Sequence, residues 1–153
     1  MVGLVKKRGI AWGGVALAAL IGVIWLGRSS LRPVCTQLEG HDQLRILANE
    51  VAPGTARFFC YSDAGAQVRF VLARDSEGKL HSILDACIQC YKFRKGFSFS
   101  GGYLVCRLCG NRYPIKTMTK GKASCVPVRL ATRTTGDSIE VRTADLRAKR
   151  WLF

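Results

Sequence analysis

The chain has 153 residues, which is enough for one modest domain beside a membrane-spanning segment. Its formal net charge is +14, from 24 Lys and Arg against 10 Asp and Glu. The basic residues are scattered and form no recognisable module for reading nucleic acid, so the charge does not indicate a partner of that class. Such a surface attracts anionic lipid headgroups or acidic proteins, or simply keeps a domain soluble beside a negatively charged bilayer.

The N-terminus predicts a membrane anchor. Residues 1–8 form a basic tail that contains Lys6, Lys7 and Arg8, and residues 9–27 carry no charged side chain. As a helix, this segment is about 28 Å long, which is close to the hydrocarbon thickness of a bilayer. A basic cluster before the span favours a cytoplasmic N-terminus. We therefore expect a single-pass protein of the cell membrane with an extracytoplasmic soluble domain. A cleaved signal peptide is the alternative.

Residues 28–54 are expected to connect the anchor to the domain and to contain one short helix. Apolar residues follow helical spacing there, at Leu44, Leu47, Ala48 and Val51. A Pro-Gly pair directly after them ends the pattern.

Residues 55–153 are predicted to form a β-rich domain, because the apolar pattern changes to a period of two. Val68, Phe70 and Leu72 alternate with polar residues, as in a strand. A turn signal at 75–78 separates this strand from a second one at 80–84. Three further strands are predicted, at residues 103–105, 126–130 and 139–141.

Five of the seven cysteines form a regular pattern. Cys87 and Cys90 make one Cys-x-x-Cys pair, and Cys106 and Cys109 make a second pair 15 residues later. Cys125 follows after another 15 residues. Two residues between the cysteines of a pair allow both sulfurs to face one point, so the two pairs can supply four thiolates to a metal ion or an iron–sulfur cluster. The pattern favours a metal centre.

Two other interpretations of the cysteines stay open. An extracytoplasmic domain favours disulfides, although an odd number of cysteines would leave one thiol over. A thioredoxin-like redox pair would open a helix, whereas glycines, aromatic residues and strand patterns surround both pairs.

Several residues outside this pattern also invite a functional interpretation. His41 and His81 could each ligate a metal, but a surface or partly buried histidine is the expected role. Asp85 could accept hydrogen bonds from the backbone amides of the first cysteine pair, or simply form a turn. Cys35 and Cys60 could form a disulfide, although Cys60, beside two phenylalanines, is expected to be a buried and inert thiol.

The block from residue 65 to residue 130 carries motifs around its cysteines. They are Val68-Arg69-Phe70, Leu84-Asp85-Ala86-Cys87-Ile88-Gln89-Cys90-Tyr91, Lys95-Gly96-Phe97, Gly102-Tyr103-Leu104-Val105-Cys106-Arg107-Leu108-Cys109-Gly110-Asn111-Arg112-Tyr113 and Cys125-Val126-Pro127. In these motifs the chain resembles the FtrD-like family, membrane-anchored iron–sulfur proteins found alongside bacterial iron-uptake components. The resemblance implies that Cys87, Cys90, Cys106 and Cys109 are cluster ligands, with Cys125 as a fifth candidate. It also implies a part in iron transport or in associated electron transfer.

We therefore expect a single N-terminal transmembrane helix followed by a small, mostly β (α+β) domain with two Cys-x-x-Cys knuckles. The expected cofactor is an iron–sulfur cluster or iron, with zinc as the alternative. The expected partners are the membrane and membrane iron-transport or redox proteins. No Ser, His and Asp set, paired acids or phosphate-binding glycine loop stands out, so a redox carrier or accessory protein is expected rather than an enzyme. A structural zinc module that docks a membrane partner and a thiol–disulfide exchange protein are the alternatives.

Overall fold

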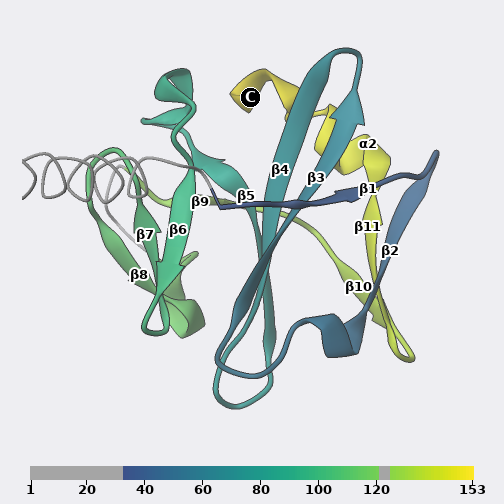
Figure 1. The fold of residues 1–153 in the computed structure, drawn as a ribbon, viewed down its shortest axis with the longest axis horizontal. Coiled ribbons are helices and arrows are strands. Elements are labelled where there is room, and N and C mark those ends of the chain that lie inside the picture. The colour runs from purple at the N-terminus through teal and green to yellow at the C-terminus, as the bar shows by residue number, and fades with distance from the viewer. Residues whose placement is uncertain (1–32, 121–124) are drawn as a thin grey trace, which may run out of the picture. The chain divides into compact units, whose positions relative to one another are not determined.

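The computed structural model describes residues 33–120 and 125–153, which belong to one compact unit (Figure 1). The largest sheet has the strand order β1 (Thr36–Leu38), β3 (Ala56–Asp63), β4 (Ala66–Arg74), β5 (Leu80–Cys87) and β9 (Pro127–Arg129). A second sheet consists of β10 (Arg133–Thr135), β11 (Ser138–Arg142) and β2 (Gln43–Leu47), and a third of β6 (Phe97–Ser100), β7 (Tyr103–Cys106) and β8 (Arg112–Pro114). The helical segments are short, namely η1 (Ala48–Glu50), η2 (Tyr91–Phe93), η3 (Ile115–Thr117), α2 (Thr143–Arg147) and η4 (Arg150–Leu152). The predicted mostly β domain is confirmed.

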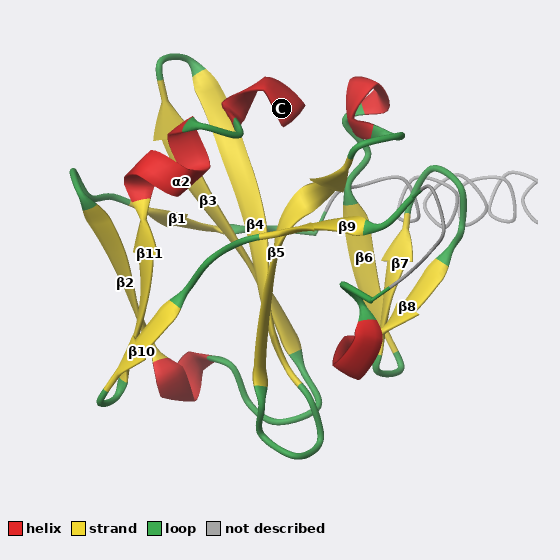
Figure 2. Ribbon diagram, turned by 180° about the vertical axis from the view of Figure 1, so that it is seen from behind, coloured by secondary structure: helices red, strands yellow, loops and turns green. Residues whose placement is uncertain are grey.

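The central strands are buried on both faces. In Figures 1 and 2 the two smaller sheets lie on opposite sides of β3, β4 and β5. Successive side chains of a strand point to opposite faces, so the strands feed two separate apolar clusters. Phe70 packs in the cluster that also contains Leu44 and Ile139, whereas its neighbour Val71 packs in the cluster that contains Phe97. The second cluster also contains three of the cysteines, which places them at the boundary between the large sheet and the sheet of β6, β7 and β8.

The predicted strands are confirmed, with small changes at their ends. The two strands of the expected hairpin are β4 and β5, which pair in antiparallel fashion with Phe70 opposite Leu84. The strands predicted at 103–105, 126–130 and 139–141 are β7, β9 and β11.

The helix predicted in the connecting segment is wrong. The residues form strand β2 followed by the 3₁₀ turn η1, and both β1 and β2 belong to the sheets. Leu44 and Ile46 are buried, while Arg45 and Leu47 between and after them are exposed, so the period is two. β2 pairs with β11, which places Leu44 opposite Val141. This distant partner supplies hydrogen bonds that local spacing could not reveal.

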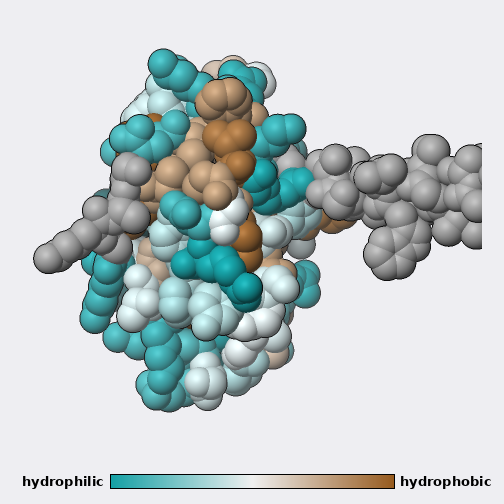
Figure 3. All heavy atoms as spheres, turned by 90° about the vertical axis from the view of Figure 1, so that its left-hand side faces the viewer, coloured by the Kyte–Doolittle hydropathy of each residue, from teal (hydrophilic) through white to brown (hydrophobic). Residues whose placement is uncertain are grey.

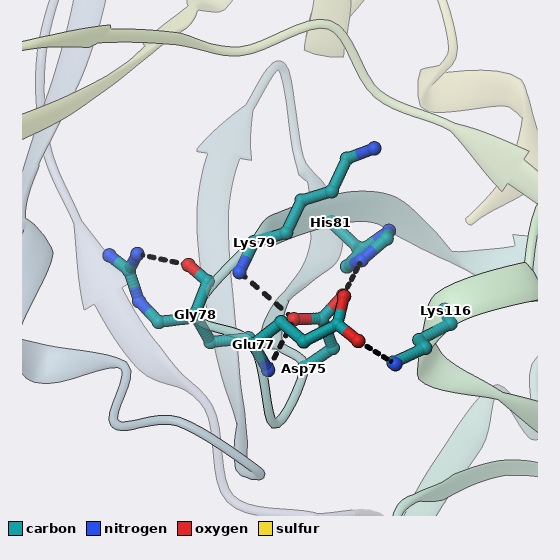
Figure 4. A network of polar contacts seen from close by, with 7 residues as sticks. Asp75, Glu77, Gly78, Lys79, His81 and Lys116 are labelled. Carbon is teal, nitrogen blue, oxygen red and sulfur yellow. Dashed lines mark hydrogen bonds and ion pairs between the residues drawn. The ribbon is translucent and has the colours of Figure 1, made fainter.

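The turn between β4 and β5 is held by a network around Asp75 (Figure 4). Oδ1 of Asp75 accepts hydrogen bonds from the backbone N–H groups of Glu77 (3.0 Å) and Lys79 (2.9 Å), and its Oδ2 lies 2.9 Å from His81 Nε2. The hydrogen bond with His81, helped by the two backbone bonds and opposed by desolvation, holds the pKa of Asp75 below its usual value. Lys116, which lies in η3, forms an ion pair with Glu77. The turn is thereby fastened to the residues that follow β8.

Cys35 and Cys60 form a disulfide, with their Cα atoms 5.7 Å apart. The expectation that Cys60 is an inert thiol is therefore wrong. Strand β1 runs parallel to β3 and places Gln37 opposite Cys60, which brings Cys35 within bonding distance. A parallel pairing between segments so far apart in sequence leaves no local pattern.

Within the described ranges, no helix is long and apolar enough to cross a membrane. The span predicted at residues 9–27 lies outside the residues that the structure describes.

Candidate metal centre

Three elements bring the five patterned cysteines together. Cys87 is the last residue of β5 in the large sheet, and Cys106 is the last residue of β7 in the sheet of β6, β7 and β8. Cys90 and Cys109 follow in the turns after these strands. Cys125 comes two residues before β9, whose first residue pairs with Cys87.

Both Cys-x-x-Cys turns are closed by backbone hydrogen bonds. The N–H of Cys90 donates to the carbonyl oxygen of Cys87 at 3.2 Å, with the Cys87 Sγ atom 3.3 Å away. In the second turn the N–H of Gly110 donates to the carbonyl oxygen of Cys106 at 2.9 Å. Gly110 has a φ of +75°, a conformation that glycine adopts without strain. The two turns therefore have the knuckle geometry that the spacing predicts.

The sulfur atoms converge in two overlapping groups. The Sγ atoms of Cys90, Cys106 and Cys109 all lie within 4.8 Å of one another, and so do those of Cys87, Cys90 and Cys125. Cys90 belongs to both groups, and its Sγ lies 3.3 Å from that of Cys125. All five patterned cysteines are free thiols, whereas the two outside the pattern form the disulfide. In the described part of the chain neither histidine joins such a group: His81 lies against Asp75, and His41 is exposed.

The thiols differ in accessibility and acidity. Cys87, Cys106 and Cys125 are buried, Cys90 is half-buried and Cys109 is exposed. Burial raises the pKa values of the Cys90 and Cys106 thiols. The hydrogen bond with Cys90 acts to lower the pKa of Cys125, but burial and the other thiols outweigh it and raise that pKa to about 11. Burial acts to raise the pKa of Cys109, yet hydrogen bonds from the Asn111 backbone and from neighbouring thiols lower it on balance. Thiols packed this closely ionise together only when a cation lies among them.

Asp85 joins β5, the strand that ends at Cys87, to the start of β6. Its buried carboxylate accepts a hydrogen bond from the Phe97 backbone N–H at 2.6 Å and one from Arg69 Nε at 3.1 Å. At Gly96, where φ is +66°, a Cβ atom would lie 2.5 Å from Asp85 Oδ1, so the carboxylate occupies the space that a side chain would need. One expectation was that Asp85 accepts hydrogen bonds from the backbone amides of the first cysteine pair. The structure shows Asp85 accepting one from the amide of Phe97, at the start of β6.

Arg69 is a supporting residue that sequence reasoning missed. Besides its ion pair with Asp85, its guanidinium contacts Cys35 Sγ at 3.0 Å and the carbonyl oxygen of Pro33 at 2.6 Å. The sequence does contain a signal for this role, namely a charged residue inside the apolar run of β4. In the structure the Arg69 side chain is buried and does not face solvent.

Two further polar groups lie at the site. The Tyr113 hydroxyl donates a hydrogen bond to the carbonyl oxygen of Cys125, and burial raises the pKa of Tyr113 to about 12. Arg107, inside the second knuckle, has a buried Nη1 atom without a hydrogen-bond partner among the residues that the structure describes. The hydrogen bond from Tyr113 holds the backbone in place at Cys125.

This donor set fits a thiolate-bound centre. Four cysteine thiolates are the usual ligands of [2Fe–2S] and [4Fe–4S] clusters and of structural zinc, and two knuckles from different sheets can present them to a common point. The fold and the site define a small β domain with a cluster of cysteine thiols, suited to a metal centre, at the boundary of two sheets.

Comparison with protein families gives the same class. The chain matches the model of the family described as membrane iron-sulfur containing protein FtrD-like over residues 51–153, and it belongs to that family. The resemblance seen in the sequence motifs is confirmed.

Solved structures show weak likenesses. A chain from a complex of reduced oxygenase and oxidized ferredoxin in carbazole 1,9a-dioxygenase is 15% identical with a TM-score of 0.45, over 65% of this chain and 92% of that one. A chain assigned as an NADH-dependent nitrite reductase small subunit from Mycobacterium tuberculosis is 16% identical with a TM-score of 0.41, over 65% of this chain and 95% of that one. The search of curated proteins finds no match.

Proposed function

We propose that this chain is a membrane-anchored electron carrier that holds an iron–sulfur cluster on Cys87, Cys90, Cys106 and Cys109, with Cys125 beside them. The observation that carries the proposal is the convergence of Cys90, Cys106 and Cys109, whose sulfur atoms come from two knuckles and lie within 4.8 Å of one another. The description of the family supports an iron–sulfur cluster and gives no support to zinc.

The chain's own residues have distinct parts in this function. Such a cluster supplies one-electron oxidation and reduction. Buried Cys87 and Cys106 would hold it on the side of the apolar cluster that includes Phe97, where water is excluded. Exposed Cys109 marks the side from which an electron can enter or leave. Ligation by cysteine alone is favoured over mixed ligation by cysteine and histidine, because His81 is bound to Asp75 instead.

We further propose that residues 9–27 anchor the chain in the membrane and that the domain is extracytoplasmic. The Cys35–Cys60 disulfide supports an oxidising compartment, because disulfides persist there and are rare in the cytoplasm. A part in iron transport is supported by the family resemblance of the cysteine motifs alone.

The test is the composition and spectrum of the full-length chain, purified without oxygen in a neutral detergent. We expect visible charge-transfer absorption, iron and acid-labile sulfide, and a reversible redox titration. A colourless protein with one zinc ion would instead indicate a structural zinc module. A metal-free protein with oxidised cysteine pairs would indicate thiol–disulfide exchange.

A further inference from the structure

We propose that the exposed face around Cys109 is a docking surface for the acidic face of a redox protein. The inference deepens the proposed function and rests on it, because an electron carrier must bring its exposed ligand close to a partner.

The first observation is the charge of the segment that carries the thiols. Residues 86–136 contain ten Lys and Arg and no Asp or Glu, so all the acidic residues of the chain lie elsewhere. Asp85, at the boundary, is buried and bonded to Arg69, so it presents no negative charge at the surface. One of the ten, Lys116, is paired with Glu77 from the β4–β5 turn. Since interactions between exposed charges extend about 8 Å at physiological ionic strength, the excess of cations favours a positive field near the knuckles.

The second observation is that cations lie beside the centre without acidic partners. Lys92, Arg94 and Lys95 follow Cys90 directly and are all exposed. Among the described residues none of the three forms an ion pair, and the residues outside that range contain no Asp or Glu. Their charges are therefore available to a partner.

The third observation is a set of exposed apolar side chains close in sequence to these cations and to the cysteines, called the apolar patch below. Ile88 is 51% exposed, Phe93 62% and Leu108 40%, and Ile88 and Leu108 lie within the two knuckles themselves. Figure 3, which shows the side that carries β6, β7 and β8, has a band of apolar side chains bordered by hydrophilic ones. An apolar centre with a charged rim is the usual anatomy of a protein–protein interface.

The position of Cys109 favours a protein over a lipid surface as the occupant. This thiol is exposed and directly follows Leu108, the patch residue of the second knuckle. A lipid headgroup layer on this face would cover the exit for electrons, whereas a redox partner would use it. Transient electron-transfer interfaces are small, and their charges govern the association rate and its salt dependence.

Binding can be tested with a probe of known charge. The full-length, cluster-loaded chain in zwitterionic nanodiscs would be titrated with a plant-type ferredoxin, an acidic electron carrier, and with basic cytochrome c as the control for charge sign. We expect ferredoxin to bind at low salt and to lose at least tenfold in affinity on moving to physiological salt, and we expect cytochrome c not to bind.

Matched variants locate the surface. Lys92→Gln/Lys95→Gln should weaken ferredoxin binding about three- to tenfold at low salt. Arg57→Gln/Lys79→Gln removes the same charge from exposed positions in β3 and in the β4–β5 turn, both outside residues 86–136, and should change the affinity less than twofold. Phe93→Ser should weaken binding at both salt concentrations, because it removes apolar contact rather than charge.

Several results would overturn the inference. One is an equal loss of ferredoxin affinity in the two double variants, and another is that loaded protein does not bind ferredoxin at all. A third is that the Lys92→Gln/Lys95→Gln variant adsorbs less to phosphatidylglycerol vesicles but binds ferredoxin as the parent does. Iron and sulfide are measured on the same samples. Absence of a cluster would overturn the proposed function, whereas a loaded protein that fails to bind would overturn the docking surface alone.

Discussion

Arg69 and Asp85 form a buried ion pair, with Nε of Arg69 3.1 Å from Oδ2 of Asp85 and side chains only 8% and 0% exposed. The same guanidinium contacts Cys35 of the disulfide, and the same carboxylate binds the N–H of Phe97. The pair thereby joins the N-terminal end of the described chain to β6, the strand before the one that ends at Cys106.

Replacing Asp85 by Asn should destabilise the protein by about 3 kcal/mol, because the Arg69 charge is left buried without its partner. Urea unfolding of the full-length chain would measure the change. Glu140→Gln, which removes the partly exposed ion pair with Arg45, is the control and should cost less than about 1 kcal/mol. A similar small loss for both variants would contradict a structural role for the buried pair.

Gly96→Ala should lower both stability and cluster content. The added methyl would meet the Asp85 carboxylate, so we expect a loss of about 3 kcal/mol or more. Gly101→Ala is the matched control: its φ of +57° is similar, but nothing lies within 4 Å of the added carbon. That variant should cost only about 1 kcal/mol and leave iron content unchanged. Equal effects at the two glycines would show that backbone conformation, and not the carboxylate, sets the cost.

The four paired cysteines should act as a unit. Replacing any one of Cys87, Cys90, Cys106 or Cys109 by Ser should sharply lower the metal content, because an incomplete thiolate set loses binding free energy that is coupled to folding. Removing the disulfide with Cys35→Ser/Cys60→Ser is the control. It should cost stability, about 3 kcal/mol for a loop of this size, but leave metal bound. Parental metal loading in Cys106→Ser would contradict the ligand assignment.

Cys125→Ser should leave metal bound but change its behaviour. Four thiolates already complete a cluster, yet Cys125 lies 3.3 Å from Cys90. We expect a shifted midpoint potential, or a shorter lifetime of the visible absorption in air. A variant with the parental potential and air stability would show that Cys125 is only a buried small residue.

The anchor predicted at residues 9–27 can be tested by extraction. The full-length chain should stay in membranes after an alkaline wash, and a chain that begins at Ser29 should be soluble. Full-length protein found in the soluble fraction with a shortened N-terminus would indicate a cleaved signal peptide.

Sequence reasoning succeeded where the signal was local. The hairpin of β4 and β5 shows in the alternation around Phe70, and the knuckles show in the cysteine spacing. It failed where a distant segment decides the outcome. Leu44 lies in a strand because β11 pairs with it, and Cys60 is bonded because β1 lies parallel to β3. The burial of Arg69 likewise depends on Asp85, a residue of the neighbouring strand.

Strand β9 lies at one edge of the large sheet, and its pairing with β5 is irregular: Cys87 lies opposite Pro127 and Ile83 opposite Arg129. Cys125 precedes this strand by two residues, so two of the thiols lie at the same end of one strand pair. A metal held by Cys87, with Cys125 packed beside it, would stabilise that edge, and its loss would allow β9 to open locally. The amides of β9 would then exchange with solvent faster than those of β3 and β4, so hydrogen exchange at one edge of the large sheet would report whether the centre is loaded.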